Sequence, residues 1–231
     1  NWHCAECGHT HLRAMAVGVR RTAEELGRAF PDTPVVVSRG DSVRHTVGAE
    51  PCLVVATPGA EPVASGGYAA ALLLDAGSTL IRPGLRSPEE ALRRWLQAAA
   101  LVRSGPDGGE VVIVADPGAL AVQALVRWDP AGFAARELEQ RTAVRFPPAA
   151  RVAELTGAEA DVEELRELAE LPETADVLGP TLDAGTARLI VRVPRSSGIK
   201  LAGALRAAAG VRSARRSGGP VRIRIDPVDL G

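Results

Sequence analysis

Two cysteines near the start of the chain, Cys4 and Cys7, have the spacing of a metal-binding pair. In Cys-x-x-Cys-Gly the two thiolates face one ion, and Gly8 permits the tight turn behind them. Because a tetrahedral zinc ion needs four ligands, we expect Cys4 and Cys7 to bind zinc together with ligands that lie upstream. Two alternatives stay open: metal-free thiols, or a local site completed by the nearby histidines His3, His9 and His11.

A loop rich in proline and glycine, residues 57–67, lies between two apolar runs at 52–56 and 69–74, and a phosphate would be expected at its first part, residues 57–62. Each run has the length of a strand buried on both faces, and α/β sheets bind ligands at the carboxyl ends of such strands. The loop lacks the groups for phosphate binding. It has no lysine, two of its residues are prolines without an N–H, and Glu61 brings negative charge. The sequence therefore predicts a nucleotide-handling core whose phosphate loop does not work.

Charge is divided unevenly along the chain, although its net value is only −1. Residues 154–183 hold ten acidic residues and one basic residue, whereas residues 185–231 hold ten basic and two acidic ones. Alternation in 188–192 and 222–224 predicts arginines on an exposed sheet face, with further arginines in a loop beside it and few carboxylates to compensate them. We expect this region to bind DNA phosphates. The predicted contacts are Arg188, Arg192, Arg195, Arg212, Arg215 and Arg216.

The composition fits two modest domains, because 231 residues with 46% hydrophobic residues can build two cores. Lysine occurs once, at Lys200, so the abundance of arginine reflects coding bias as well as any partner. Three cysteines do not form a disulfide framework. No run of 18 uncharged apolar residues and no signal peptide is visible, so we expect a cytoplasmic, nucleoid-associated protein.

Local patterns predict an alternation of strands and helices in the first half. A capping box, Thr22-Ala23-Glu24-Glu25, predicts a helix that ends before Pro31, and Ser87-Pro88-Glu89-Glu90 predicts one that runs to about Arg103. Arg39-Gly40-Asp41 is expected in a solvated turn. We expect strands at 12–17, 34–38 and 110–115, and further helices that start at Pro117 and at Asp129-Pro130, the last of them ending near Arg141.

Pro147-Pro148 marks a boundary, because two prolines in succession cannot continue a helix. The segments that follow alternate as strand, helix, strand, strand, helix, strand. Their expected ranges are 151–155, 158–171, 176–178, 187–193, 198–209 and 221–225. This β-α-β-β-α-β order is that of the ferredoxin-like fold, which predicts an independent domain without specifying an activity.

In their order and spacing these segments resemble the primosomal protein N′ family, the PriA-type replication restart helicases, over the whole chain. The resemblance rests on Trp2-x-Cys4-x-x-Cys7-Gly8, 22–31, Arg39-Gly40-Asp41-Ser42, Glu137-Leu138-x-x-Arg141 with Phe146-Pro147-Pro148, Leu178-Gly179-Pro180, and Ile225-Asp226-Pro227. It implies an α/β fold: a RecA-like second helicase lobe with the remnant of a zinc-binding insertion, then an α+β ferredoxin-like domain that helps hold branched DNA. Cys4 and Cys7 match one pair of a four-cysteine zinc site.

The expected domains are the end of the zinc-binding insertion at 1–11, helicase lobe 2 at 12–130, a helical connector at 131–149 and the C-terminal domain at 150–231. The motor motifs of the family are degenerate here. Where the family has Gln-Val-x-Gly-Arg-Ala-Gly-Arg, this chain has 97–104, and its arginines are replaced by Leu101 and Ser104. Those arginines stabilise the transferring γ-phosphoryl group, a contribution on the order of 10³-fold in rate. The degenerate motor positions are Pro58, Glu61, Gln97, Leu101 and Ser104.

The resemblance and the departures together predict a DNA-binding primosomal protein that recognises branched or forked DNA, supports replication restart and DNA repair, and lacks helicase activity. Its partners would be branched or single-stranded DNA and other restart or single-strand-binding proteins, with no membrane. An active ATP-dependent 3′-5′ helicase with its ATP site upstream is the main alternative. A protein-interaction scaffold would use the acidic helix 158–171, and a Rossmann-type enzyme is disfavoured because no Gly-x-Gly-x-x-Gly follows a strand.

Overall fold

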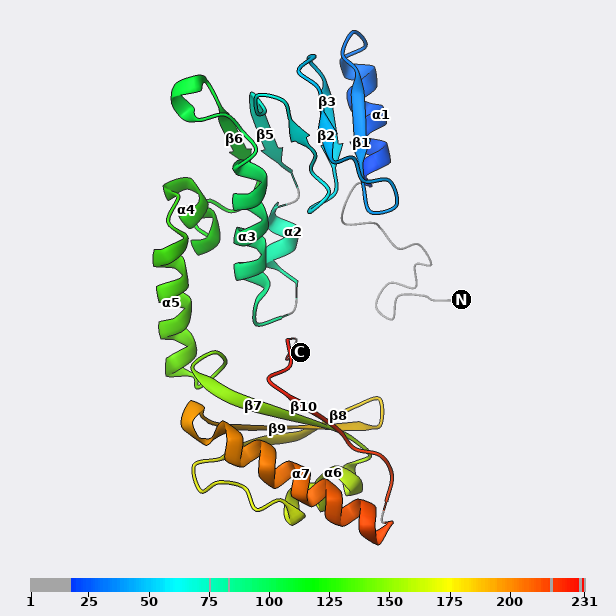
Figure 1. The fold of residues 1–231 in the computed structure, drawn as a ribbon, viewed down its shortest axis with the longest axis vertical. Coiled ribbons are helices and arrows are strands. Elements are labelled where there is room, and N and C mark those ends of the chain that lie inside the picture. The colour runs from blue at the N-terminus through cyan, green and yellow to red at the C-terminus, as the bar shows by residue number, and fades with distance from the viewer. Residues whose placement is uncertain (1–17, 75, 83, 217, 229, 231) are drawn as a thin grey trace, which may run out of the picture. The chain divides into compact units, whose positions relative to one another are not determined.

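The computed structural model describes residues 18–74, 76–82, 84–216, 218–228 and 230, and these form two compact units (Figure 1). Unit 1 contains the described residues up to 82 together with 87–128, and unit 2 contains 84–86 and the described residues from 129 onward. The chain thus divides after Trp128, and the helix expected as a connector at 131–149 is grouped with the C-terminal unit. The strand expected at 12–17 lies outside the described residues.

Unit 1 consists of short parallel strand pairs with helices beside them (Figure 1). Its elements are α1 Val19–Ala29, β1 Val35–Ser38, β2 Thr46–Val47, β3 Leu53–Ala56, β4 Val63–Ala64, β5 Ala70–Leu73, α2 Ala76–Leu80, α3 Ser87–Ala99, β6 Glu110–Ile113 and α4 Leu120–Arg127. Among the described residues, β1 pairs with β3, β2 with β4 and β5 with β6, each in parallel. Parallel pairing agrees with an α/β core, but these pairs do not join into one sheet.

The expectation that both apolar runs are buried on two faces is wrong. β3 is half-buried along its length, while β5 alternates, with Leu72 62% exposed and Leu74 50% exposed. The physical reason is that α3 packs against β5 from one side, so only one face of the strand is covered among the described residues.

Two predicted helix starts are also wrong. α1 begins at Val19, and the Thr22 N–H already donates to the Gly18 carbonyl (3.1 Å), so Thr22 lies within the helix and does not cap it. α4 begins at Leu120, because Pro117 lies in a turn closed by Asp116 Oδ1, which accepts from the Gly118 N–H (2.9 Å). α3 begins at Ser87 as expected and ends at Ala99, short of Arg103.

The start predicted at Asp129-Pro130 is confirmed by α5, Pro130–Ala143. The Asp129 carboxylate caps the helix by accepting from the Gly132 N–H (2.8 Å), which satisfies a donor that has no partner within the helix. A Cβ at Gly132 would lie 2.1 Å from that carboxylate, so this cap requires glycine at position 132.

Unit 2 confirms the predicted β-α-β-β-α-β order. Its remaining elements are β7 Ala150–Gly157, α6 Glu159–Leu168, β8 Asp176–Asp183, β9 Thr186–Pro194, α7 Gly198–Arg215 and β10 Arg222–Ile225. The strands form one antiparallel sheet in the order β10-β7-β9-β8, the ferredoxin-like arrangement. Helices α6 and α7 cover one face of this sheet (Figure 1). β8 extends beyond the predicted 176–178, with an irregularity between Leu178 and Thr181.

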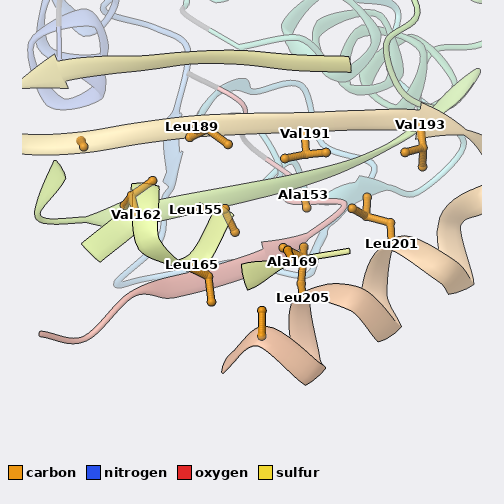
Figure 2. Packing of buried hydrophobic residues seen from close by; sticks show 12 residues of the cluster. Ala153, Leu155, Val162, Leu165, Ala169, Leu189, Val191, Val193, Leu201 and Leu205 are labelled. Atoms are coloured by element: carbon orange, nitrogen blue, oxygen red, sulfur yellow. The ribbon is translucent and has the colours of Figure 1, made fainter. Parts of the chain in front are cut away.

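The core of unit 2 lies between the sheet and these two helices (Figure 2). Alternate residues of β9, among them Leu189 and Val191, are fully buried against Leu165 of α6 and Leu205 of α7. Burying one such side chain contributes about 1.5–3 kcal/mol. The intervening β9 residues therefore lie on the opposite face of the sheet, which we call the open face.

Candidate nucleic-acid interface

The open face of the sheet carries arginines from two strands. On β9, Arg188 and Arg192 alternate with the buried residues, as the sequence predicted. The register places Arg188 and Arg222 on either side of Thr156 of β7, and Arg224 directly opposite Glu154. Residues directly opposite each other in an antiparallel sheet share a face, so β9 and β10 bring their arginines to the same side of the sheet.

A buried carboxylate pairs with two of these arginines. Glu154 is 1% exposed; its Oε1 accepts from Arg188 Nε (2.5 Å), and its Oε2 forms an ion pair with Arg224. A carboxylate removed from water is stable only when such partners compensate it. The expectation that the basic region has few compensating carboxylates is therefore wrong at these two arginines, because strand pairing brings in Glu154, which lies 34 residues from Arg188 in the sequence.

Arg192 and Arg195 are bound to their surroundings too. Arg192 Nε donates to Asp176 Oδ2 (2.7 Å), its Nη1 donates to the Val144 carbonyl (2.8 Å), and its guanidinium lies over the Phe146 ring at 5.7 Å from the centroid. Arg195 Nη1 donates to the Pro148 carbonyl (3.0 Å), and its side chain is exposed. Arg192 thus stabilises the junction before β7, while Arg195 retains solvent access.

Arg212 occupies a structural position inside unit 2. We expected it in a loop, but it lies in the last turn of α7 and is only 7% exposed. Its Nε donates to Glu164 Oε2 (2.7 Å), and its Nη2 donates to Asp161 Oδ1 (2.7 Å), so it links α7 to α6. Asp161 also accepts from the Gly219 N–H (2.8 Å), which fixes the segment before β10. The expectation of a loop position is wrong because α7 extends beyond residue 209.

Arg215 and Arg216, by contrast, are exposed at the end of α7, with Arg216 as its C-cap. Within the described part of the chain, no carboxylate lies within ion-pair distance of either side chain, nor of Arg222. Arg216 also lines a groove of about 360 Å³ whose other walls include Leu165, Ala209 and Pro220. These three arginines are therefore available to a polyanion without first breaking an internal ion pair.

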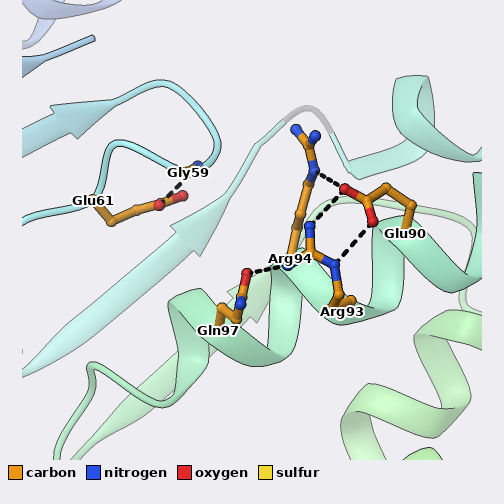
Figure 3. A network of polar contacts seen from close by, with 6 residues as sticks. All are labelled: Gly59, Glu61, Glu90, Arg93, Arg94 and Gln97. Atoms are coloured by element: carbon orange, nitrogen blue, oxygen red, sulfur yellow. Dashed lines mark hydrogen bonds and ion pairs between the residues drawn. The ribbon is translucent and has the colours of Figure 1, made fainter. Parts of the chain in front are cut away.

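The loop at 57–62 is closed by its own carboxylate (Figure 3). Glu61 Oε2 accepts from the Gly59 N–H (2.8 Å), an N–H of the kind that a phosphate-binding loop presents to its ligand. Ser38 Oγ donates to the Ala60 carbonyl (2.6 Å), and Tyr68 Oη donates to the Pro62 carbonyl (2.7 Å). The loop is thus held in place by contacts that use its polar groups internally.

Most of the other positions predicted to be degenerate motor positions also make internal contacts. Gln97 Oε1 accepts from Arg93 Nη1 (2.9 Å), the half-buried Leu101 accepts from the Tyr68 N–H through its carbonyl (3.0 Å), and Ser104 Oγ donates to Asp107 Oδ2 (2.5 Å). Pro58 is exposed. None of these five side chains offers a cation.

Both arginines near Gln97 are bound to one acid (Figure 3). Arg93 donates to both oxygens of Glu90 (2.6 and 2.9 Å), and Arg94 Nε donates to Oε1 (2.8 Å). These hydrogen bonds, first from Arg93 and then from Arg94, hold the pKa of Glu90 at about 2. Its stabilising contribution is complete above the ordinary value of 4.5 and is lost as pH falls through about 2.

Sequence reasoning missed two buried charges. Glu154 had a signal, because it is an isolated acid in an apolar strand segment. Arg141 is part of the motif Glu137-Leu138-x-x-Arg141, and that motif does not indicate that its side chain is buried. It is 4% exposed and donates to the carbonyls of Leu85 (2.8 Å) and Pro147 (3.3 Å) and to Glu137 Oε2 (3.1 Å). Arg141 therefore joins α5 to the segment 84–86 and to the entry into β7.

The predicted zinc pair, Cys4 and Cys7, lies outside the described residues, as do the neighbouring histidines. Within the described residues, no cluster of three histidine, cysteine or carboxylate side chains is placed to hold a metal ion. Zinc binding therefore stays a prediction. A search of the described helices finds none with the length and apolar character needed to span a membrane.

Comparison with known proteins gives a consistent result. Residues 142–228 match the family model described as the primosomal protein N C-terminal domain. The chain is 51% identical over 241 residues to a probable replication restart protein PriA of Mycobacterium leprae, and 48% identical over 248 residues to that of Mycobacterium tuberculosis H37Rv. The replication restart protein PriA of a Synechocystis strain is 25% identical over 198 residues, which cover 77% of this chain and 24% of that protein. Both mycobacterial alignments cover 99% of this chain, which spans only 37–38% of the length of those relatives.

Proposed function

The chain belongs to the PriA-type replication restart family, and from this premise we propose that it acts as a DNA-binding part of a restart protein without a working motor. Membership of the family supports a role in replication restart. The finer proposal is that unit 2 binds branched or forked DNA through its phosphates, and that unit 1 serves as a scaffold.

The observation that carries the DNA-binding proposal is a set of exposed arginines, Arg215, Arg216 and Arg222, that have no carboxylate partner among the described residues. Replacing counterions on DNA phosphates by arginine is favourable and independent of base sequence. An arginine already paired with a buried acid gains less from a phosphate, because it must give up that pair.

The positions of these arginines suit DNA with more than one arm. Arg215 and Arg216 end the helix that covers one face of the sheet, while Arg222 lies on the open face by its register with Thr156. A duplex that passes one side of unit 2 leaves the other side free for a second arm. Forked DNA is therefore expected to bind more tightly than a linear duplex of the same length.

The experiment measures binding of fluorescent forked and linear DNA to the 231-residue chain across a range of salt concentrations. We expect the double variant Arg215→Ala, Arg216→Ala to bind forked DNA on the order of tenfold more weakly, with a salt slope shallower by about 1–2. The matched control, Arg20→Ala with Arg28→Ala, removes two exposed charges from α1 and is expected to change affinity little. An equal loss of DNA affinity in both double variants would show that only net charge matters. Unchanged DNA binding by the Arg215→Ala, Arg216→Ala variant would refute the phosphate site.

A further inference from the structure

Trp128 is an exposed indole in an unfavourable backbone conformation. It forms the C-cap of α4 with φ 54° and ψ 41°, in the left-handed region that glycine or asparagine usually occupies at the ends of helices. A bulky side chain is rare there. Trp128 is 57% exposed, whereas Trp95 of α3 is 5% exposed in the core of unit 1. Packing therefore accounts for Trp95. The left-handed conformation of Trp128 ends α4, and packing does not account for the exposure of this large apolar residue.

The indole stands beside a groove of about 400 Å³ within unit 1. The end of α3, the segment 102–109 and β6 supply the other walls, with Val102, Val111 and Gly105 among the lining residues. These side chains are small or apolar. A volume of this size lies within the range of small-ligand pockets and is large enough for a flat heterocycle against the indole face.

The charge at the groove favours a ligand with one negative group. Of the described residues that line it, Arg103 alone carries a charge, and its side chain is exposed. Its Nε donates to the Gly66 carbonyl (3.1 Å), which orders the side chain of this lining residue. The Ser104 hydroxyl is already bound to Asp107. The described lining thus combines an aromatic face, apolar walls and a single cation, and the Asp107 carboxylate next to it is bound by Ser104.

We propose that this groove holds one unpaired base of single-stranded DNA, stacked on Trp128, with a neighbouring phosphodiester at Arg103. The proposal rests on the DNA-binding function above and adds a second type of contact to it. A phosphodiester carries one negative charge, which a single arginine matches. A nucleoside triphosphate would bring several negative charges, and the described lining residues offer only one positive charge to compensate them. Stacking of a base on an aromatic side chain tolerates any base and contributes roughly 5- to 150-fold in affinity.

The experiment compares three ligands for the 231-residue chain: an oligothymidylate, an abasic single strand of equal length, and a duplex. The abasic strand keeps the phosphates and lacks the bases. We expect the unmodified chain to bind oligothymidylate at least fivefold more tightly than the abasic strand. Trp128→Leu keeps an apolar side chain without an aromatic face, and it should abolish this preference while leaving duplex binding unchanged.

Three further variants sharpen the result. Trp128→Phe keeps an aromatic ring and should retain most of the preference. Val126→Ala is the matched control, because Val126 is 70% exposed on the same helix and does not line the groove. Arg103→Ala should weaken binding of oligothymidylate and of the abasic strand equally. In the unmodified chain, oligothymidylate should quench indole fluorescence, and the quenching should be lost in Trp128→Leu.

Each remaining outcome overturns the inference in a recognisable way. Unchanged oligothymidylate binding by Trp128→Leu, in a chain that still binds forked DNA, overturns the groove and leaves the proposed function standing. Equal loss for all three ligands would reduce Trp128 to a structural residue. Competition by ATP that depends on Trp128 would identify a free nucleotide as the occupant. Absence of DNA binding by the unmodified chain would overturn both proposals.

Discussion

Among single residues, Glu154 controls how much positive charge the open face presents. It is buried, and its single negative charge is shared between Arg188 and Arg224. The charge that reaches solvent is therefore smaller than the arginine count of the strands suggests. Arg222 keeps its full charge, since no ion pair to it exists among the described residues.

Substituting Glu154 should change stability and DNA binding in opposite directions. Glu154→Gln keeps the shape and removes the charge, which leaves two arginines without their acid; we expect the free energy of unfolding to fall by about 2–4 kcal/mol. The same change frees two cations on the open face, so affinity for DNA should rise and its salt slope should steepen. Denaturant unfolding and DNA titration measure the two effects.

The matched control is Asp183→Asn, an exposed acid at the end of β8 in the same sheet. It removes an equal charge without uncovering a buried pair and should shift stability by less than about 0.5 kcal/mol. If Glu154→Gln lowered DNA affinity in a folded chain, the open face would not be a phosphate surface.

At the level of elements, Arg212 connects α6, α7 and the segment before β10. It binds acids on α6 and, through Asp161, the backbone at Gly219. Arg212→Ala should lower the free energy of unfolding by about 2–4 kcal/mol, because it removes the cation that both Asp161 and Glu164 bind. The nearby Arg215→Ala should cost less than about 0.5 kcal/mol, because that side chain is exposed.

Arg212→Lys keeps the charge and loses the fork geometry, so it should recover only part of the stability. Denaturant unfolding of the three variants tests the assignment. Equal stability of Arg212→Ala and Arg215→Ala would show that Arg212 does not hold these elements together.

Arg188 and Arg212 show which features of unit 2 the sequence can predict and which it cannot. Alternation along 187–193 predicts which β9 side chains are buried, because the period of a strand is local. The partners of Arg188 and Arg212 lie 34 and 48 residues away, and they depend on strand register and helix packing. The fold order of unit 2 was therefore predictable, whereas the division between paired and free arginines was not.

A local pattern predicts the wrong helix start where the same residues fit both the cap and the interior of a helix. Thr22 and Glu25 have capping-box spacing, yet the same residues fit the interior of α1 once Val19 and Arg20 join the helix. Asp129-Pro130 predicted its helix correctly, because proline is favoured in the first turn and the aspartate found a free N–H at Gly132.

For the whole molecule, the motor is expected to be inactive. In the Pro58–Pro62 loop the Gly59 N–H is bound to Glu61, and the resemblance to the family predicts that Leu101 and Ser104 occupy the arginine positions of its motif. Each loss removes a group that would stabilise a phosphate or the charge of the transition state. Other residues could compensate for one such loss. We do not expect them to compensate for all of these losses together.

The test is an ATPase assay with forked DNA on the natural full-length protein, because the chain spans less than two fifths of its mycobacterial relatives. We expect no DNA-stimulated turnover, either in the natural protein or in its Glu61→Gln variant. Turnover on the order of 1 s⁻¹ or faster in the unmodified protein, within the usual range of enzymes, would establish the active helicase instead.

The contact between Arg141 and Leu85 has a consequence for where this part of the chain can be cut. Unit 2 draws residues 84–86 from a stretch that otherwise belongs to unit 1, and Arg141 donates to the Leu85 carbonyl there. A fragment that began at residue 129 would lack this acceptor, and a guanidinium that is 4% exposed would lose one of its partners. A fragment that began at the family match, residues 142–228, would lack Arg141 as well.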